Sequence, residues 1–292
     1  MTADTLAISG PGLSAEINPL GAELWTLRDG DGRDLLWTGD AAFWSGRAPI
    51  LFPIVGTVAG DTYRVGDTAY TLPRHGFARR RRFAPVEARA DRVTLRLTSD
   101  DETRAVYPFA FQLDLAFAAS GARLDIAAEL TNTGGGPLPA SFGYHPAFLW
   151  PLPYGAARAE HRILFEVAET ASAHRPDAQG LIVPASRPAQ LDGRTLTLDD
   201  ALFADGALVL TELKSRSLTY GAATGPHLRI TAPDTPHLGI WSMRTAPFVC
   251  IEPWQGYADP AGFEGEIWDK PGIVRVEPGA RRSWRMGIEL LD

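Results

Sequence analysis

Phe111-Gln112-Leu113-Asp114-Leu115-Ala116-Phe117 sets the fold class of this chain, because its odd-numbered residues are all large and apolar. Apolar residues at every second position are typical of a strand that buries one face. Residues 92–98 before this stretch and residues 123–130 after it repeat the alternation, and residues 283–290 show it once more. These four segments predict half-buried antiparallel strands.

Shorter stretches predict further strands, at residues 6–9, 22–28, 162–167, 195–198, 207–212, 217–220, 227–231, 237–241 and 248–252. Residues 63–70 predict a hairpin with Gly66-Asp67 at its turn, since glycine suits the first central position of a type II′ turn. No segment shows a sustained 3.6-residue period with helix caps. So many strands, with almost no helices to cover a parallel sheet, predict an all-β fold: a large antiparallel sandwich. We interpret residues 1–292 as a single domain.

Composition excludes several classes of function. The net charge of −7 and the pI of about 5.4 argue against a nucleic-acid partner, which would require a basic surface. The run Arg79-Arg80-Arg81-Arg82 is expected to face water, with Arg79 as a possible exception. The N-terminus lacks the features of a signal peptide and no segment is apolar enough to span a bilayer, so a cytoplasmic protein without a membrane partner is expected.

Cys250 is the only cysteine, so an intramolecular disulfide is impossible and a metal site based on cysteines is excluded. Its apolar surroundings predict a buried, inert thiol. Two loops, residues 150–161 and 171–193, are long enough to edge a binding cleft.

Three titratable residues stand in rigid contexts of Gly, Pro and aromatic residues. His145 lies in Gly-Tyr-His-Pro, Glu252 lies in Ile-Glu-Pro-Trp, and His75 lies in Arg-His-Gly-Phe. Pro146 restricts the backbone of His145, and the end of a buried strand would partly desolvate Glu252 and favour its protonated form. A histidine and a carboxylate on opposite sides of one small molecule could serve as general acid and general base. The alternative is that each is a structural residue bonded within the sheet.

Two more residues are candidates for substrate contacts. Arg47 enters an apolar, proline-bounded segment, where its guanidinium needs a partner: either a substrate oxygen or a protein carboxylate. Trp254 offers an apolar face to a sugar ring, or else it is packed core. His75, His145 and Glu252 could also ligate zinc, but the His-Glu-x-x-His spacing is absent and we predict no metal. A serine triad is disfavoured because no Gly-x-Ser-x-Gly element occurs.

Taken in order, several segments resemble the aldose 1-epimerase (galactose mutarotase) family, most closely its LacX-like branch. They are residues 18–24 (Asn-Pro-Leu-Gly-Ala-Glu-Leu), 46–56, 72–79, 143–148 and 251–256. The resemblance runs over nearly the whole chain. It implies a β-supersandwich fold and an isomerase of carbohydrate metabolism that interconverts α and β anomers through ring opening, without a cofactor.

The resemblance also implies roles for individual residues. His145 corresponds to the general acid that protonates the ring oxygen, and Glu252 to the base that takes the proton of the anomeric hydroxyl. Arg47 and His75 correspond to groups that hold the sugar and stabilise charge on the ring oxygen. Asp205 is the match for an aspartate that binds sugar hydroxyls, although Asp199 and Asp200 lie close by.

Alternatives remain at this point. The early segment reads Gly-Arg-Ala-Pro-Ile rather than the Asn-Arg-Ile of galactose enzymes, which leaves the aldose open. A related branch acts on hexose 6-phosphates and has an arginine after His-Gly-Phe, so Arg79, with Arg74 and Arg47, could bind a phosphate. The partner is therefore a monosaccharide or a sugar phosphate. Other hypotheses are a non-catalytic carbohydrate-binding protein, or a glycosidase that pairs Glu252 with Asp259 or Glu264.

Overall fold

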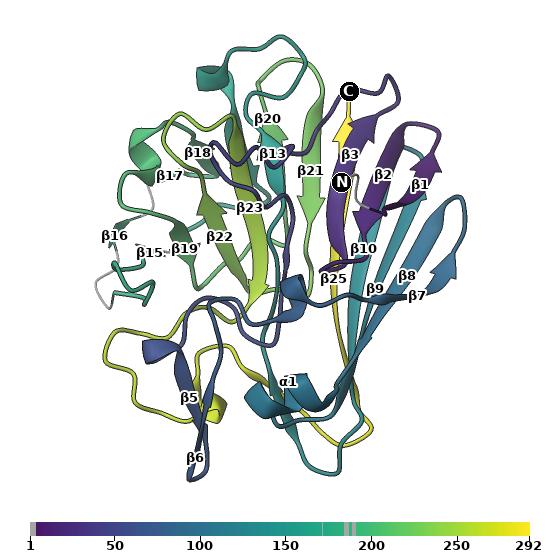
Figure 1. Cartoon of the computed structure of the whole chain (residues 1–292). Helices are drawn as coiled ribbons and strands as arrows, with labels where there is room; N and C mark the ends of the chain where they lie inside the picture. The colour runs from purple at the N-terminus through teal and green to yellow at the C-terminus, as the bar shows by residue number, and fades with distance from the viewer. Residues whose placement is uncertain (1–3, 171, 184–186, 189–190) are drawn as a thin grey trace.

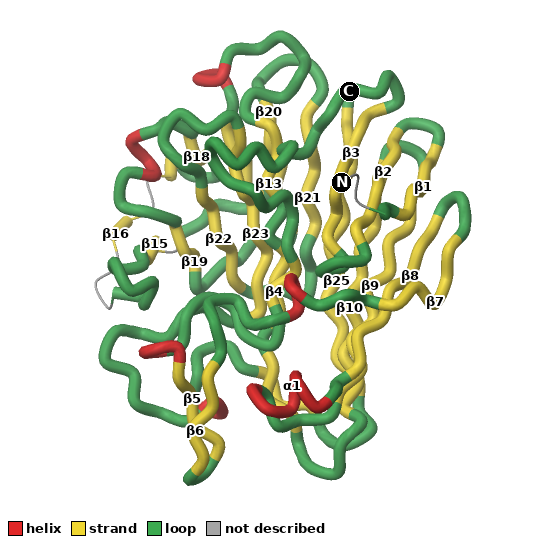
Figure 2. Tube along the Cα trace, viewed as in Figure 1, coloured by secondary structure: helices red, strands yellow, loops and turns green. Residues whose placement is uncertain are grey.

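The computed structural model describes residues 4–170, 172–183, 187–188 and 191–292. It consists mainly of two antiparallel β-sheets packed face to face (Figure 1, Figure 2), so the prediction of an all-β sandwich is confirmed. Helix α1 (Asp101–Val106) and a hairpin of β5 (Thr62–Val65) and β6 (Thr68–Thr71) lie together at the bottom of Figure 1. None of the described helices has the length and hydropathy needed to cross a membrane.

The larger sheet contains most of the strands that the alternating pattern predicts. Its strands in spatial order are β17 (Leu191–Asp192), β18 (Thr195–Thr197), β14 (Arg162–Phe165), β20 (Ser217–Gly221), β21 (His227–Thr231), β25 (Arg281–Leu291), β10 (Arg123–Asn132), β9 (Phe111–Ser120), β8 (Arg92–Thr98) and β7 (Ala84–Ala88).

The smaller sheet carries the region of interest for function. Its strands in order are β16 (Arg187–Pro188), β15 (Ser172–His174), β19 (Leu208–Leu210), β22 (His237–Trp241), β23 (Phe248–Gln255), β12 (Phe142–Tyr144) and β4 (Ile50–Leu51), and β13 (Ala147–Leu149) also pairs with β23. Separate small sheets are formed by β1 (Leu6–Gly10), β2 (Leu13–Asn18) and β3 (Glu23–Asp29), and by β11 (Leu138–Ala140) with β24 (Val274–Val276). Short 3-10 helices are η1 (Ala59–Asp61), η2 (Ala78–Arg80), η3 (Arg158–Glu160), η4 (Ala201–Phe203) and η5 (Ile267–Asp269).

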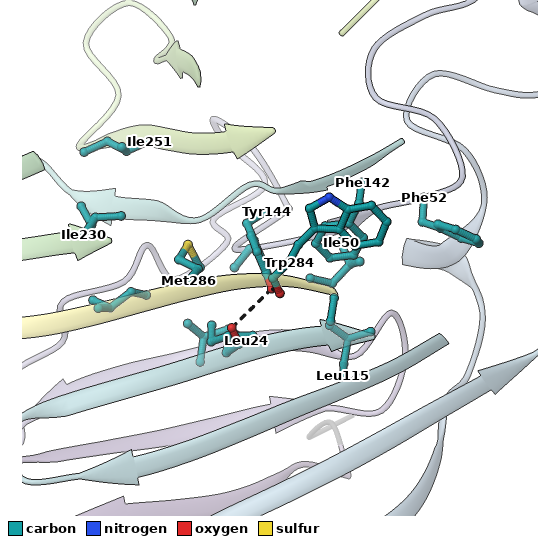
Figure 3. Close-up of a cluster of buried hydrophobic side chains, with 14 of the residues drawn as sticks. Leu24, Ile50, Phe52, Leu115, Phe142, Tyr144, Ile230, Ile251, Trp284 and Met286 are labelled. Carbon is teal, nitrogen blue, oxygen red and sulfur yellow. Dashed lines mark hydrogen bonds between the residues drawn. The ribbon is translucent and has the colours of Figure 1, made fainter. Parts of the chain in front are cut away.

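The core lies between the two large sheets. In β9 and β10 every second side chain is buried, as the alternation predicts. Trp284 of β25 stacks on Phe142 of β12 with ring centroids 4.9 Å apart, and Figure 3 shows the two rings side by side. The hydroxyl of Tyr144 in β12 donates to the carbonyl oxygen of Trp284 at 2.7 Å. These contacts fix the smaller sheet against the larger one.

Several sequence predictions need correction. Strands β2 and β7 were not predicted, because small or polar residues such as Ala15 and Glu87 dilute their apolar pattern. The predicted loop 171–193 contains β15, β16 and β17, while residues 171, 184–186 and 189–190 lie outside the described part. The predicted hairpin at residues 63–70 is confirmed, and Gly66 has a φ of 57° at its turn.

Helix α1 was not predicted, because no segment shows a sustained 3.6-residue period with helix caps, yet this helix is capped. The side chain of Asp100 accepts a hydrogen bond from the Thr103 amide, and the Thr103 hydroxyl accepts one from the Asp100 amide, each at 2.8 Å. This reciprocal pair is a capping box. A helix of six residues spans less than two turns, so no period of 3.6 residues could reveal it.

Strand β23 positions the site, and it is buried on both faces. Val249 and Ile251 belong to the core between the sheets, so the even-numbered residues, including Cys250 and Glu252, point to the opposite face. The prediction ended this strand at Glu252, but it continues through Pro253 to Gln255.

Pro253 fits inside this central strand because its neighbour is interrupted there. Strand β13 pairs with β23 up to Cys250, and β12 pairs with it again from Trp254. The amide of Ile251 points to this side, where it donates to the carbonyl oxygen of Pro146 at 3.2 Å. The nitrogen of Pro253, two residues further along, points to the same side. No strand pairs with β23 at this position, so the N–H that proline lacks is not needed for a ladder hydrogen bond. His145 lies in this interruption, directly beside Glu252.

Candidate active site

A cavity of about 540 Å³ opens on the face of the smaller sheet that points away from the core. This volume lies within the ~300–1,000 Å³ range of small-molecule sites. His75, His145, Asp205, Glu252 and Trp254 all line it. Arg79 lines it too, so the structure brings six of the seven predicted site residues to one cavity.

His145 and Glu252 are in near contact. The Nε2 atom of His145 lies 3.1 Å from Oε2 of Glu252, and the two residues are only 8% and 1% exposed. The expectation that they face each other across a small molecule is wrong, because 3.1 Å leaves no room for a ligand between them. They stand side by side on one wall of the cavity, where both can reach neighbouring atoms of one ligand.

Burial governs the protonation of this pair. It lowers the pKa of the His145 imidazole to about 3 and raises the pKa of the Glu252 carboxyl well above its ordinary value. Both shifts favour the uncharged form of the group. Burial therefore disfavours a charged His145–Glu252 ion pair in the empty cavity.

Aromatic rings enclose His145. Trp44 stacks on its imidazole with ring centroids 5.1 Å apart, and Trp241 meets it edge to face at 6.2 Å. Both tryptophans line the cavity, and the sequence reasoning missed both. Trp241 lies opposite Cys250 in the β22–β23 ladder. The side of the sheet to which its indole points therefore follows from strand register, which the sequence alone did not provide.

Trp254 occupies a slot that two glycines create. Its indole lies between Gly143 of β12 and Gly239 of β22, and a Cβ atom built at these positions would come within 2.7 Å and 2.5 Å of it, respectively. Contacts this short cannot be accommodated unless the indole moves. The two glycines therefore allow a large apolar ring to lie flat in the cavity wall.

Replacing Gly239 by alanine is expected to destabilise the protein by about 1–3 kcal/mol, because the added methyl group overpacks against Trp254. Denaturant unfolding would measure the loss. Gly135→Ala is the matched control, since a Cβ atom there meets nothing within 4 Å. Equal stability of the two variants would show that the slot is not tight.

His75 is held in an unusual backbone conformation. Its backbone φ is 66°, a value that residues other than glycine rarely adopt. Two hydrogen bonds with Gly56 stabilise it: the His75 amide donates to the Gly56 carbonyl at 2.8 Å, and the Gly56 amide donates to Nδ1 of His75 at 3.1 Å. Since Nδ1 accepts a hydrogen bond, the neutral ring carries its proton on Nε2.

Arg47 is not brought to the cavity. Its guanidinium stacks on Trp25, with Cζ 3.9 Å from the ring centroid, and Nη1 donates to the Trp25 carbonyl oxygen at 2.8 Å. Its backbone amide donates to Glu23. The protein itself thus provides the partners that the sequence reasoning left open between protein and substrate.

Arg74 and Arg79 supply the positive charge of the cavity instead. Arg79 donates to the carbonyl oxygen of Arg74 at 2.9 Å. Within the described residues, no carboxylate lies at ion-pair distance from either guanidinium. Arg80 and Arg82 are exposed, as expected for the arginine run, and Arg81 pairs with Asp100 and Glu102.

One predicted loop borders the cavity and the other does not. Residues of the segment 176–182 line it, which confirms the expectation for the loop 171–193, whereas residues 150–161 lie elsewhere. The glycosidase hypothesis required Asp259 or Glu264 beside Glu252, and neither lines the cavity. Asp259 is buried and pairs with Nζ of Lys270 at 2.8 Å.

Cys250 lies beside the acid–base pair. Its thiol is buried, and burial raises its pKa, as expected for an inert cysteine. However, Sγ and the ligand atoms of His145 and Glu252 all lie within 4.8 Å of one another. The exclusion of a metal site with a cysteine ligand was therefore too broad, because it considered only groups of cysteines.

Comparisons with known proteins extend these observations. The aldose 1-epimerase family matches residues 4–275. Protein LacX, encoded on the chromosome of Lactococcus lactis subsp. lactis, is 31% identical over 284 residues, which cover 94% of this chain and 95% of that protein. A galactose mutarotase related enzyme from Lactobacillus acidophilus has a TM-score of 0.92 at 26% identity, covering 99% of this chain and 97% of that one.

A galactose mutarotase-like protein from Lactobacillus casei is similar to the same extent. Its TM-score is 0.91 at 27% identity, and the match covers 98% of this chain and 100% of that one. The likeness thus includes both sheets and the strands that carry the cavity. Since the family match also spans most of the sequence, the chain has the galactose mutarotase-like fold and belongs to the aldose 1-epimerase family.

Proposed function

We propose that this protein interconverts the α and β anomers of an aldose, with His145 and Glu252 as the acid–base pair. The observation that carries the proposal is the 3.1 Å separation of their side chains on the wall of a cavity of sugar size. The ring oxygen and the anomeric oxygen of a pyranose are bonded to the same carbon. Two adjacent groups can therefore serve both oxygens at once.

The reaction requires one proton to enter and one to leave. His145 donates a proton to the ring oxygen O5 while Glu252 removes the proton of the hydroxyl on C1, and the C1–O5 bond breaks to give the open aldehyde. Rotation about C1–C2 exposes the other face of the carbonyl. The reverse proton transfers then close the ring as the other anomer, so neither a cofactor nor a net proton is consumed.

This cycle is compatible with the effect of burial on the pair. Imidazolium with carboxylate contains the same number of protons as imidazole with carboxylic acid. The two forms differ only in which group holds the proton. Its transfer from Glu252 to His145 precedes ring opening, and ring opening returns the pair to the form that burial favours. His145 and Glu252 thus exchange roles between opening and closure without drawing a proton from water.

Neighbouring residues would hold the sugar. Trp254 and Trp44 line the cavity, and the C–H face of a pyranose would pack on their apolar rings. The Nε2–H of His75 is available to donate to the ring oxygen as negative charge develops there. We propose Asp205 as an acceptor for sugar hydroxyls, since it also lines the cavity.

Two-dimensional NMR exchange between anomers tests the proposal. We expect the purified protein to accelerate exchange for at least one of glucose, galactose and glucose 6-phosphate, or for another aldose in a wider panel. A sugar-binding protein without catalysis would give saturable binding and an unchanged exchange rate. That result would refute the enzyme and support the binding protein.

A second candidate, a hexose-6-phosphate 1-epimerase, is favoured by Arg74 and Arg79. Both guanidinium groups line the cavity, and a phosphate would provide the anionic partner that the described carboxylates do not. Because Arg47 lies against Trp25, it does not take part. Arg74 and Arg79 would bind the 6-phosphate, while His145 and Glu252 would transfer protons at C1.

Replacing Arg79 by glutamine is then expected to lower kcat/KM for glucose 6-phosphate about 10-fold or more, which is the scale of a lost hydrogen bond between charged groups. The value for glucose should change by less than about twofold. Arg80→Gln is the matched control, because Arg80 is exposed and does not line the cavity. Equal losses for both sugars in Arg79→Gln would indicate that Arg79 has no role in phosphate binding.

A further inference from the structure

The thiol of Cys250, a third group able to bind metals, is buried beside the acid–base pair and does not itself line the cavity. Cys250 and Glu252 are two residues apart on β23 and therefore point to the same face, where His145 enters from the interruption between β12 and β13. The sulfur, the imidazole nitrogen and a carboxylate oxygen all lie within 4.8 Å of one another. The mechanism proposed above uses two of these groups and gives Cys250 no task.

A second observation points to a ligand at this place. Glu252 is only 1% exposed, and its Oε2 atom has no hydrogen-bond partner among the described residues. It lies 3.1 Å from Nε2 of His145, but without the alignment of a hydrogen bond. A buried carboxylate oxygen without a donor is costly, and a bound cation would satisfy it.

We propose that His145, Cys250 and Glu252 bind one soft divalent transition-metal ion, such as Zn²⁺, and that the bound ion blocks the cavity to the sugar. Three protein ligands would leave a fourth position open toward the cavity for water. The blocking effect rests on the proposed function, because the ion would occupy both members of the acid–base pair. Metal binding itself does not depend on that function.

The donor set is suited to zinc rather than to magnesium or calcium. A thiolate and an imidazole are preferred by Zn²⁺ and related ions, whereas Mg²⁺ and Ca²⁺ take oxygen ligands. One thiolate and one carboxylate also neutralise the double positive charge, which matters for an ion in a buried place. On binding, the protons of the thiol and the carboxyl would pass to the solvent.

The geometry requires only a small adjustment. Tetrahedral bonds to zinc of about 2.0–2.3 Å separate neighbouring ligand atoms by roughly 3.3–3.8 Å. The nitrogen–oxygen pair at 3.1 Å is already close to this value. The sulfur, which lies within 4.8 Å of the other two atoms, would have to approach by about 1 Å.

Titration with Cd²⁺, a spectroscopic substitute for Zn²⁺, tests the proposal without an activity assay. We expect the ultraviolet absorption band of a cadmium–thiolate bond, saturating at one equivalent, because the chain has a single cysteine. In Cys250→Ala the band should vanish and the affinity for Zn²⁺ should fall at least 10-fold. Mg²⁺ should neither produce nor displace the signal. His145→Ala keeps the thiol and should also weaken Cd²⁺ binding at least 10-fold.

The outcomes separate this proposal from the proposed function. No thiolate band in the folded protein, or equal Zn²⁺ affinity in Cys250→Ala, would overturn the metal site whatever the protein does to sugars. A thiolate band in a protein that exchanges no anomers would keep the metal site and reject the anomerase. If both hold, Zn²⁺ should slow anomer exchange in the unmodified protein, and Cys250→Ala should require at least 10-fold more Zn²⁺ for the same inhibition.

Discussion

Glu252→Gln should slow anomer exchange by about 10²-fold or more, the scale at which general acid–base groups contribute. Glutamine keeps the shape of the side chain but cannot take the proton of the anomeric hydroxyl. NMR exchange rates at saturating sugar would measure the loss. Binding of the sugar should change little, so the effect should appear in kcat rather than in KM.

The stability of Glu252→Gln provides an independent check. Burial raises the pKa of the Glu252 carboxyl, which indicates that the uncharged form is the more favourable one in the empty cavity. A neutral amide should therefore leave the free energy of unfolding unchanged or increase it. Glu264→Gln is the matched control for activity, since Glu264 lies outside the cavity and should keep the full rate. Full activity in Glu252→Gln would remove the carboxylate from the mechanism.

The sequence predicted the large sheet well because each long strand there buries one face only. Strands β9 and β10 alternate over their whole length, and their partners follow from the same pattern. In β23 the pattern fails, because every residue of this strand is buried, on the face away from the core as well as on the core face. The strand was recognised from its apolar run, but its extension beyond Glu252 depends on the interrupted neighbour that accepts Pro253.

The sequence reasoning chose residues that lie together in the structure where a residue type is rare and its context is rigid. His75, His145 and Glu252 reach one cavity because the turn at His75 and the gap between β12 and β13 both lie beside β23. The prediction did not hold for Arg47. An arginine in an apolar segment looks the same in the sequence whether its guanidinium binds a substrate or packs against Trp25.

Cross-strand register explains most of what the sequence reasoning missed. Trp241 faces the cavity because it lies opposite Cys250 on the neighbouring strand, and Gly239 lies opposite Glu252. Such pairs depend on the register across the loop 242–247 that joins β22 to β23, and the apolar pattern of the two strands does not determine that register. Trp44 reaches His145 from an irregular segment, for which no periodic signal exists.

His145→Ala should also lower the exchange rate by about 10²-fold or more, because the ring oxygen loses its proton donor. The structure adds a more specific expectation. The imidazole lies between Trp44, stacked at 5.1 Å, and the edges of Trp241 and His75 at 6.2 Å and 5.8 Å. Removing it leaves a flat, ring-lined space that should admit free imidazole.

Added imidazole should therefore restore part of the activity of His145→Ala, and the rescue should saturate as the space fills. The same concentrations should leave Glu252→Gln inactive, because its missing group is a carboxylate. His227→Asn is the matched control: this histidine lies outside the cavity, so its replacement should keep the full rate. Full activity of His145→Ala without imidazole would show that another group protonates the ring oxygen, and His75 would then be the nearest donor to test.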